Sequence, residues 1–201
     1  MISSLAAQLC HRIPERMLLI GGEPTLFCSR CMGLYIGVAC LAFLWIAALR
    51  HDSEFAPSRG TRLLAGTMVL AMALDVLSSH EGWRQTTNSI RFLTGLAAGN
   101  GLMLLAAPGL SRLYPLWKRR RSGPAFREVH LWAYALLSCL FGGLVLRGLL
   151  PLTLLDSFAV LGCTIYLLLA CAGPPLVILW KFRNWPVDRW LSQRAGDNGL
   201  P

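Results

Sequence analysis

Long apolar stretches dominate the pattern of hydrophobic and polar positions along the chain, and polar residues collect between them. An α-helix needs about 20 residues to cross about 30 Å of hydrocarbon. Five stretches approach or reach this length, and they cover residues 32–49, 63–79, 90–108, 129–150 and 158–180. They are too continuously apolar for the alternating strands of a membrane barrel. The pattern therefore predicts an all-α, polytopic membrane bundle of about five transmembrane helices.

Two polar segments flank this predicted bundle over residues 32–180. Residues 1–31 form an N-terminal amphipathic and Cys/His segment that is too polar to span a bilayer. Its first nine residues lack the charge and the long apolar run of a signal peptide, and they are typical of a short helix lying on a membrane face. Residues 181–201 are expected to form a cytoplasmic tail.

Composition agrees with one membrane domain. The 201 residues are 55% hydrophobic and only 14% charged, whereas soluble domains carry about 25% charged residues. This deficit excludes a disordered chain, a coiled coil and an ordinary soluble enzyme. The lipid bilayer is therefore the first expected partner.

The distribution of positive charge predicts the orientation of the chain. The net charge is +9, and with five spans one side holds six Lys and Arg residues while the other holds thirteen. The basic run 118–121 lies on the second side, where it would contact anionic lipid. No aromatic residues alternate with it to stack on bases, so no nucleic-acid partner is expected. The positive-inside rule places the N-terminus outside and the C-terminus in the cytoplasm, as a multi-pass protein of the cell (inner) membrane.

A cysteine and histidine motif precedes the first span. Cys10 and His11 are followed by Cys28 and Cys31, whose Cys-x-x-Cys spacing lets two thiolates reach one ion or one another. Zinc favours tetrahedral sets of sulfur and imidazole ligands, so these residues are a candidate zinc site. Because neighbouring residues seldom both reach one metal, a three-cysteine site with His11 beside it stays open.

A disulfide or redox-active pair is the second interpretation of the same cysteines, and free structural thiols are the third. An extracytoplasmic location favours a disulfide or redox-active pair, because oxidising compartments keep thiols paired. Cys28 and Cys31 would be the redox pair and Cys10 the resolving thiol. Arg30 would then lower the thiolate pKa.

Polar residues near the ends of the second and third spans predict a pocket on the same side. Asp75 lies about one turn inside its span, where a charged side chain usually faces the bundle and has a partner. Arg91 lies at a matching depth, and His80 is a candidate for proton transfer. We therefore expect Asp75, His80 and Arg91 to be catalytic. A structural ion pair between Asp75 and Arg91 is the alternative.

Further arginines are candidates for anion binding, and small residues are candidates for helix packing. Guanidinium groups suit phosphate and carboxylate, and contact with lipid headgroups is the simpler role. The arginines expected to bind an anion or a lipid headgroup are Arg12, Arg16, Arg84 and Arg147. Asn88 or Ser89 is expected to cap the third helix. Small residues allow close helix packing in lipid, and they recur as Gly33-x-x-x-Gly37 and Gly95-x-x-x-Gly99.

The cysteine motifs at the start of the chain also resemble those of a known family. The runs Cys-His-Arg-x-Pro-Glu-Arg from Cys10 and Cys-x-Arg-Cys-x-Gly from Cys28 resemble the opening signature of a family of prokaryotic membrane proteins, domain of unknown function 2085. Asp75 and the later Thr-Asn-x-x-Arg-x-x-Thr-Gly run agree with it, over residues 8–102. The resemblance implies a multi-span membrane protein, and it supplies no activity. The residues that it makes functional candidates are the matched cysteines, His11, Asp75, Asn88 and Arg91.

Two functions follow, and the sequence leaves open whether the protein is an enzyme. The first is an integral membrane protein with an extracytoplasmic Cys/His metal site beside a polar Asp/His/Arg pocket, which would take an anionic lipid or a small anionic substrate. An open metal position would activate water, and a closed one would be structural. The second is a membrane thiol–disulfide oxidoreductase. A weaker alternative is a small transporter using Asp75 and Arg147.

Overall fold

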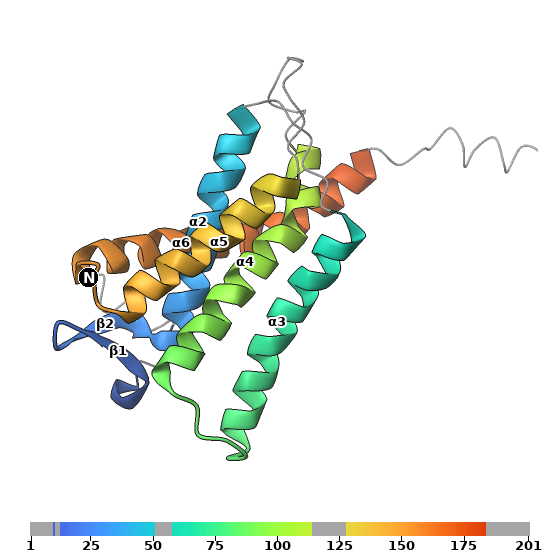
Figure 1. Cartoon of the computed structure of the whole chain (residues 1–201). Helices are drawn as coiled ribbons and strands as arrows, with labels where there is room; N and C mark the ends of the chain where they lie inside the picture. Colours follow the sequence, from blue (N-terminus) through green and yellow to red (C-terminus); the bar gives the residue numbers. More distant parts are fainter. Residues whose placement is uncertain (1–9, 11–12, 51–57, 114–127, 184–201) are drawn as a thin grey trace, which may run out of the picture. The chain divides into compact units, whose positions relative to one another are not determined.

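The computed structural model describes residue 10 and residues 13–50, 58–113 and 128–183. In this part of the chain a short 3₁₀ turn and a two-stranded hairpin precede five long helices (Figure 1). The chain divides into a unit over Met1–Tyr166 and a second unit over Leu167–Pro201, whose described residues continue the last helix. The helix predicted over residues 1–9 lies outside the described residues.

The hairpin is an element that the apolar pattern did not predict. The polar segment consists of η1, Pro14–Arg16, and the antiparallel strands β1, Met17–Ile20, and β2, Glu23–Cys28. Its turn is made by Gly21 and Gly22, with φ of 62° and 88°. A two-residue turn of type I′ needs positive φ at both positions, which glycine adopts without steric cost. The hairpin therefore closes locally, and β2 leads directly into the first long helix.

Five helices occupy the five predicted spans. They are α2, Ser29–Arg50; α3, Arg59–His80; α4, Asn88–Leu113; α5, Glu128–Leu146; and α6, Leu152–Arg183. Among the described residues, three helical stretches are long and apolar enough to cross a membrane, and they are Arg59–His80, Asn88–Ala106 and Leu152–Cys171. Shorter apolar stretches cover Ser29–Phe43 and Leu136–Leu146. The helical membrane bundle is confirmed, and the crossing of all five helices stays a prediction.

The fourth helix ends earlier than predicted. Its apolar pattern runs to Leu150, but α5 ends at Leu146 because Gly148 adopts φ of +66°. The backbone N–H groups of Gly148 and Leu149 then donate to the carbonyl groups of Val145 and Leu144, at 2.9 and 3.1 Å. This pattern is a Schellman helix end, which the left-handed glycine permits.

The two glycine motifs pack against each other. α4 contacts α2 on one side and α3 on the other. A Cβ added to Gly33 would collide with the carbonyl of Phe92 on α4, and one added to Gly95 would collide with the carbonyl of Arg30 on α2. Gly99 likewise faces the backbone of α2 at Leu34. The predicted helix-packing role of these glycines is confirmed, because only a hydrogen atom fits between the two backbones.

The hairpin is attached to the helices by apolar and polar contacts. Phe27 is 2% exposed, and its ring meets that of Tyr35 on α2 edge-on, with 5.0 Å between the centroids. The backbone N–H of Leu26 donates to Oδ1 of Asp156 on α6 at 3.0 Å. These contacts hold β2 above the first turn of α2, which positions the cysteines on both segments.

We predict that Gly95→Ala destabilises the protein although alanine favours helices. The methyl group would push α4 away from α2, at a cost of about 1–3 kcal/mol. Gly66→Ala is the matched control, because a Cβ at Gly66 on α3 meets nothing within 4 Å. Thermal unfolding in detergent should show a lower Tm for Gly95→Ala and an equal or higher Tm for Gly66→Ala. Equal effects of the two substitutions would contradict the close approach.

Candidate functional site

Three cysteines converge where the hairpin meets α2. The Sγ atoms of Cys10, Cys28 and Cys31 all lie within 4.8 Å of one another. Cys28 ends β2, Cys31 lies in the first turn of α2, and Cys10 precedes the hairpin. The backbone N–H of Cys28 also donates to Sγ of Cys10 at 3.3 Å. No disulfide is formed among the described cysteines. Three convergent sulfur atoms can bind one zinc-sized ion, so the predicted three-cysteine cluster is assembled by the fold.

The clustering also affects the thiols themselves. The hydrogen bond with the Cys10 thiol raises the pKa of Cys28, and partial burial raises it further. Neighbouring thiols disfavour a second thiolate, since each added negative charge repels the others. A divalent cation removes this penalty, because metal ligation stabilises the thiolates. The arrangement thus suits a bound cation.

A cavity of about 260 Å³ adjoins the cysteines. It is lined by the three cysteines, by Ile13 and by three arginines, Arg16, Arg30 and Arg91. The arginines come from η1, from α2 and from α4. Guanidinium groups bind phosphate and carboxylate through paired N–H donors. The cavity therefore combines soft metal ligands with donors for an anion.

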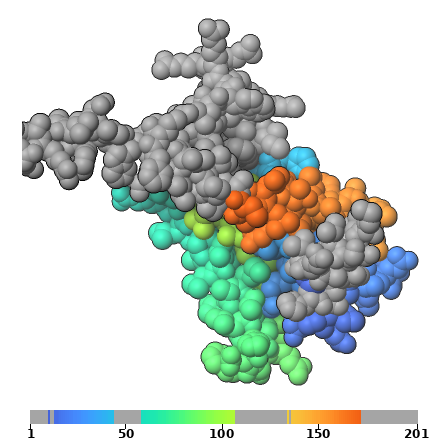
Figure 2. Space-filling model, turned by 180° about the vertical axis from the view of Figure 1, so that it is seen from behind, coloured from blue at the N-terminus to red at the C-terminus, as the bar shows by residue number. Residues whose placement is uncertain are grey.

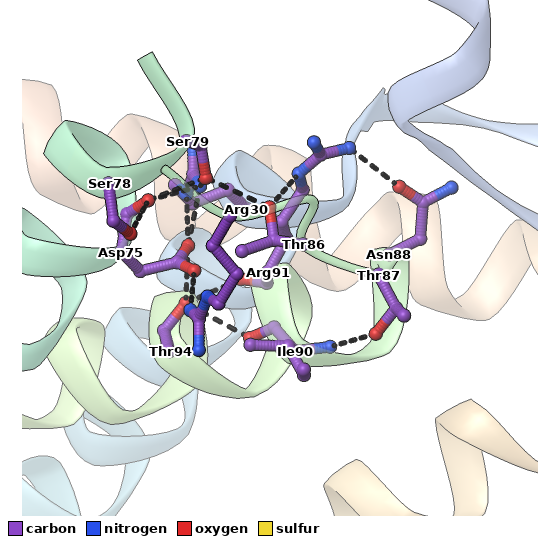
Figure 3. A network of polar contacts seen from close by, with 11 residues as sticks. Arg30, Asp75, Ser78, Ser79, Thr86, Thr87, Asn88, Ile90, Arg91 and Thr94 are labelled. Carbon is purple, nitrogen blue, oxygen red and sulfur yellow. Dashed lines mark hydrogen bonds and ion pairs between the residues drawn. The ribbon is translucent and has the colours of Figure 1, made fainter. Parts of the chain in front are cut away.

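Asp75 is the buried acid beside this cavity. Its side chain is 2% exposed and forms ion pairs with Arg30 and Arg84. Figure 3 shows Asp75 with Arg30. Nε of Arg30 donates to Oδ2 at 3.1 Å, and an Nη atom of Arg84 donates to Oδ1 at 2.8 Å. A carboxylate buried this deeply needs such neutralisation. The prediction that Arg91 pairs with Asp75 is wrong, because Arg30 from α2 and Arg84 from the α3–α4 loop form the ion pairs instead.

Arg91 belongs to a second branch of the same network. Its Nε donates to Oγ1 of Thr86 at 2.9 Å, and an Nη atom donates to Oδ1 of Asn88 at 3.2 Å (Figure 3). The Thr86 hydroxyl lies 2.9 Å from the Ser79 hydroxyl, which donates to the Asp75 carbonyl at 2.6 Å. Arg91 and Asp75 are thus connected through hydroxyl groups rather than by a direct ion pair.

Asn88 holds the hairpin instead of capping α4. Its Nδ2 donates to the carbonyl groups of Glu15 and Met17, at 3.1 and 2.9 Å. The cap is Thr87, whose Oγ1 accepts from the N–H of Ile90 at 3.3 Å. A side-chain oxygen that accepts from a helix-start N–H is the N-cap arrangement. The cap therefore lies before both predicted positions, Asn88 and Ser89.

Of the remaining predicted residues, His80 and Arg147 lie apart from these contacts. His80 is exposed at the end of α3. Arg147 falls inside the predicted span 129–150, but it is exposed just beyond the end of α5 because that helix ends at Leu146. His11 and Arg12 lie outside the described residues. Arg84 contacts Asp75 while its side chain stays 52% exposed.

Three features that build the site were missed by reasoning on the sequence. Arg30 was not predicted as the partner of Asp75, yet it both lines the cavity and binds Asp75. The hairpin was overlooked, although Gly21-Gly22 between apolar runs is a recognised turn signal. Asp156, which holds β2, has no distinguishing pattern in the sequence.

We predict that Asp75→Asn destabilises the protein by about 3 kcal/mol, the lower end of the range for a broken buried pair, since Arg84 is half exposed. Arg30→Gln should cost more than Arg84→Gln, because the Arg30 side chain is only 14% exposed. Glu81→Gln, at an exposed position beyond α3, is the charge-matched control and should leave stability nearly unchanged. Unfolding in detergent measures each difference, and an unaltered Asp75→Asn variant would refute the role of the ion pairs.

Comparison with known proteins places this site in a family context. The model of a family described as "Predicted membrane protein (DUF2085)" matches residues 10–105, which include the hairpin, the cysteine cluster and Asp75. An uncharacterized protein from Methanothermobacter thermautotrophicus is 34% identical over 98 residues, 48% of this chain and 83% of its own length.

A second uncharacterized protein, from Methanocaldococcus jannaschii, is 29% identical over 100 residues, 50% of this chain and 62% of its own length. No solved structure matches the chain. Helices α5 and α6 lie outside the matched region, which ends at residue 105. From the match and the coverage of its archaeal relative, the chain belongs to the family of predicted membrane proteins DUF2085.

Proposed function

We propose that this membrane protein binds a zinc ion through Cys10, Cys28 and Cys31 and binds a phosphate-type or carboxylate anion in the adjoining cavity. The observation that carries the proposal is the shared wall: the same three cysteines line the cavity together with Arg16, Arg30 and Arg91. An ion held by the thiolates would therefore border the anion.

Charge supports this combination. Three thiolates and one Zn²⁺ carry a net charge of about −1. Arg16, Arg30 and Arg91 line the cavity, and Arg84 joins Arg30 at the Asp75 carboxylate. Positive charge is left over after both the metal cluster and Asp75 are neutralised, and it favours an anion. Asp75 acts as a positioning residue for Arg30, while Arg91 contacts the anion.

The fourth zinc ligand is His11 or the anion itself. His11 follows Cys10 directly and completes a Cys₃His set. An anion or a water molecule in that position would make the metal a Lewis acid, which supports chemistry on a lipid headgroup. A proton-transfer role for His80 in such chemistry stays a prediction.

We also propose that this end of the bundle faces the extracytoplasmic side of the cell membrane. Six basic residues fall on that side, and they are Arg12, Arg16, Arg30, Arg84, Arg91 and Arg147. Thirteen basic residues fall on the other side, which includes the run 118–121. The positive-inside rule favours the second side as cytoplasmic.

A thiol–disulfide oxidoreductase is the second candidate, favoured by the Cys28-x-x-Cys31 spacing and by the proximity of a third thiol. Arg30 was expected to lower the thiolate pKa in that mechanism. Its guanidinium is instead engaged by Asp75. The metal site is therefore the better supported function.

The purified protein is expected to contain about one zinc per chain. Cys28→Ser is expected to lose most of this zinc, since the two remaining cysteine ligands alone bind the ion weakly. Cys171→Ser, which changes an exposed cysteine outside the cluster, should retain the zinc. Elemental analysis gives the result. Labelling of Cys28 with a membrane-impermeant maleimide in intact cells, after chelation, reports the side of the membrane.

Zinc-free protein with a Cys28–Cys31 disulfide would overturn the metal site and support the redox candidate. Zinc that is unaffected by Cys28→Ser would also exclude the proposed ligand set.

Anion binding is tested separately by titrating inorganic phosphate and vesicles containing a phosphate-headgroup lipid. Arg16→Gln or Arg91→Gln should weaken binding roughly 10- to 100-fold, the loss of about 1.5–3 kcal/mol for a hydrogen bond to a charged group. Arg147→Gln is the matched control, because Arg147 is exposed and does not line the cavity. Equal effects of the three substitutions would indicate general surface attraction and refute the site.

Two comparisons extend this titration. Binding of the vesicles but not of free phosphate identifies a lipid ligand, and binding of both identifies the phosphate group itself. Loss of binding after zinc removal identifies the anion as the fourth ligand, whereas unchanged binding assigns that position to His11.

A further inference from the structure

The cysteine cluster leaves one coordination position of a zinc ion for a ligand from outside the chain. The cluster offers three sulfur atoms, and tetrahedral zinc takes four ligands. Protein ligands of one zinc are usually separated by at least two residues, so Cys10 and the adjacent His11 seldom both bind the same ion. All three cysteines line the cavity of about 260 Å³. A molecule in this cavity can therefore reach the fourth position.

The cavity lacks a base that could activate water. The described residues that line it include no carboxylate and no imidazole. Asp75 is engaged by Arg30 and Arg84 and does not line the cavity. Hydrolytic zinc sites usually have histidine and carboxylate ligands and a general base, whereas this site is rich in sulfur and suits a further soft ligand. A thiol is such a ligand, and it needs no base because the metal itself deprotonates a coordinating thiol.

Two guanidinium groups at the cavity are not neutralised by an acid. Among the described residues, Arg16 and Arg91 form no ion pair, whereas Arg30 is paired with Asp75. The side-chain hydrogen bonds of Arg91 go to uncharged oxygen atoms. A carboxylate or phosphate group accepts strong hydrogen bonds from guanidinium. The ligand is therefore expected to carry an acidic group as well as a sulfur atom.

The cavity is accessible from water. In the space-filling view the hairpin, in deep blue, and the α3–α4 loop, in green, lie at the same end of the helices (Figure 2). Arg16 lines the cavity while being exposed, and Cys28 and Cys31 are only half-buried. Cavities of about 150 Å³ already hold molecules the size of benzene. A water-soluble molecule with a few carbon atoms can therefore enter and fit.

We propose that this cavity binds a small anionic thiol, a water-soluble molecule with one thiol and one acidic group. The thiol displaces water from the zinc, forms a Zn–S bond and releases its proton to the solvent, while the acidic group accepts hydrogen bonds from Arg16 and Arg91. This assignment rests on the proposed zinc site, and it narrows the anion to one that carries a sulfur donor. A fourth thiolate also makes the metal centre more negative than water does, which strengthens its attraction to the two guanidinium groups.

The test uses the full-length protein in detergent, loaded with cobalt(II) in place of zinc, because cobalt reports each bound thiolate by a charge-transfer absorption band. Mercaptoacetate, mercaptopropionate and mercaptobutyrate are added without oxygen, since the spacing between sulfur and acid must match the site. At least one of them should increase this absorption. In calorimetry on the zinc-loaded protein it should bind at least about tenfold more tightly than the matching hydroxy acid and the matching neutral thiol alcohol.

Arginine variants separate the two contacts of the ligand. Arg91→Gln, and Arg16→Gln at an exposed position, should each weaken binding of the thiol acid roughly 10- to 100-fold and leave binding of the neutral thiol nearly unchanged. Arg147→Gln is the matched control and should alter neither, because Arg147 is exposed and does not line the cavity. Equal losses for the acid and the neutral thiol would contradict the proposed contact with the acidic group.

The outcomes distinguish this inference from the proposed zinc site. Metal-loaded protein that binds the hydroxy acid as tightly as the thiol acid, or that gains no charge-transfer absorption, would overturn the thiol ligand and leave the zinc site standing. Protein that holds no metal would overturn both. A mixed disulfide between the ligand and a cysteine, detected by intact mass, would overturn the thiol ligand in favour of the redox candidate.

Discussion

The ion pairs of Asp75 are the interaction on which the geometry of the site depends. A carboxylate that is almost fully buried near the end of a membrane helix must be neutralised, and Arg30 and Arg84 do this from two directions. Arg30 stands between Cys28 and Cys31 in the sequence. Its direction therefore constrains the first turn of α2, and with it the direction of the thiol groups.

A second constraint is steric and comes from glycine. In lipid the hydrophobic effect does not drive helices together, so close backbone packing and polar contacts take its place. Gly33 and Gly95 let α2 and α4 approach until backbone meets backbone. This approach brings Asn88 at the start of α4 within reach of the hairpin carbonyls, and it places Arg91 at the wall of the thiol cavity.

Two sets of contacts therefore hold the candidate site in place. Apolar contacts of Phe27 and the Asp156 hydrogen bond fix the hairpin, which carries Cys28 and directly follows Arg16. Ion pairs and hydroxyl contacts then orient the arginines. Because the arginines that line the cavity come from η1, α2 and α4, a shift of either helix would separate the cysteines from the arginines.

Much of the fold was predictable because it depends on local composition. Continuous apolar runs predicted the helices, and the small-residue spacing predicted where two of them pack. The partner of Asp75 was predicted wrongly, because matching depth along two helices does not determine how each is rotated about its axis. Arg147 was misplaced for a local reason: the left-handed glycine at position 148 ends α5 before the apolar pattern ends.

The sequence by itself determined the membrane bundle, the Cys-x-x-Cys spacing and the need of Asp75 for a positive partner, since each follows from neighbouring residues or from the cost of burying charge. Only the tertiary structure decided that Cys10 reaches Cys28 and Cys31, and that Arg30 joins the cysteine cluster to Asp75. The physical reason is that composition and spacing act within one element. Contacts between elements depend on a turn, a helix rotation and a backbone approach that are settled together when the chain packs.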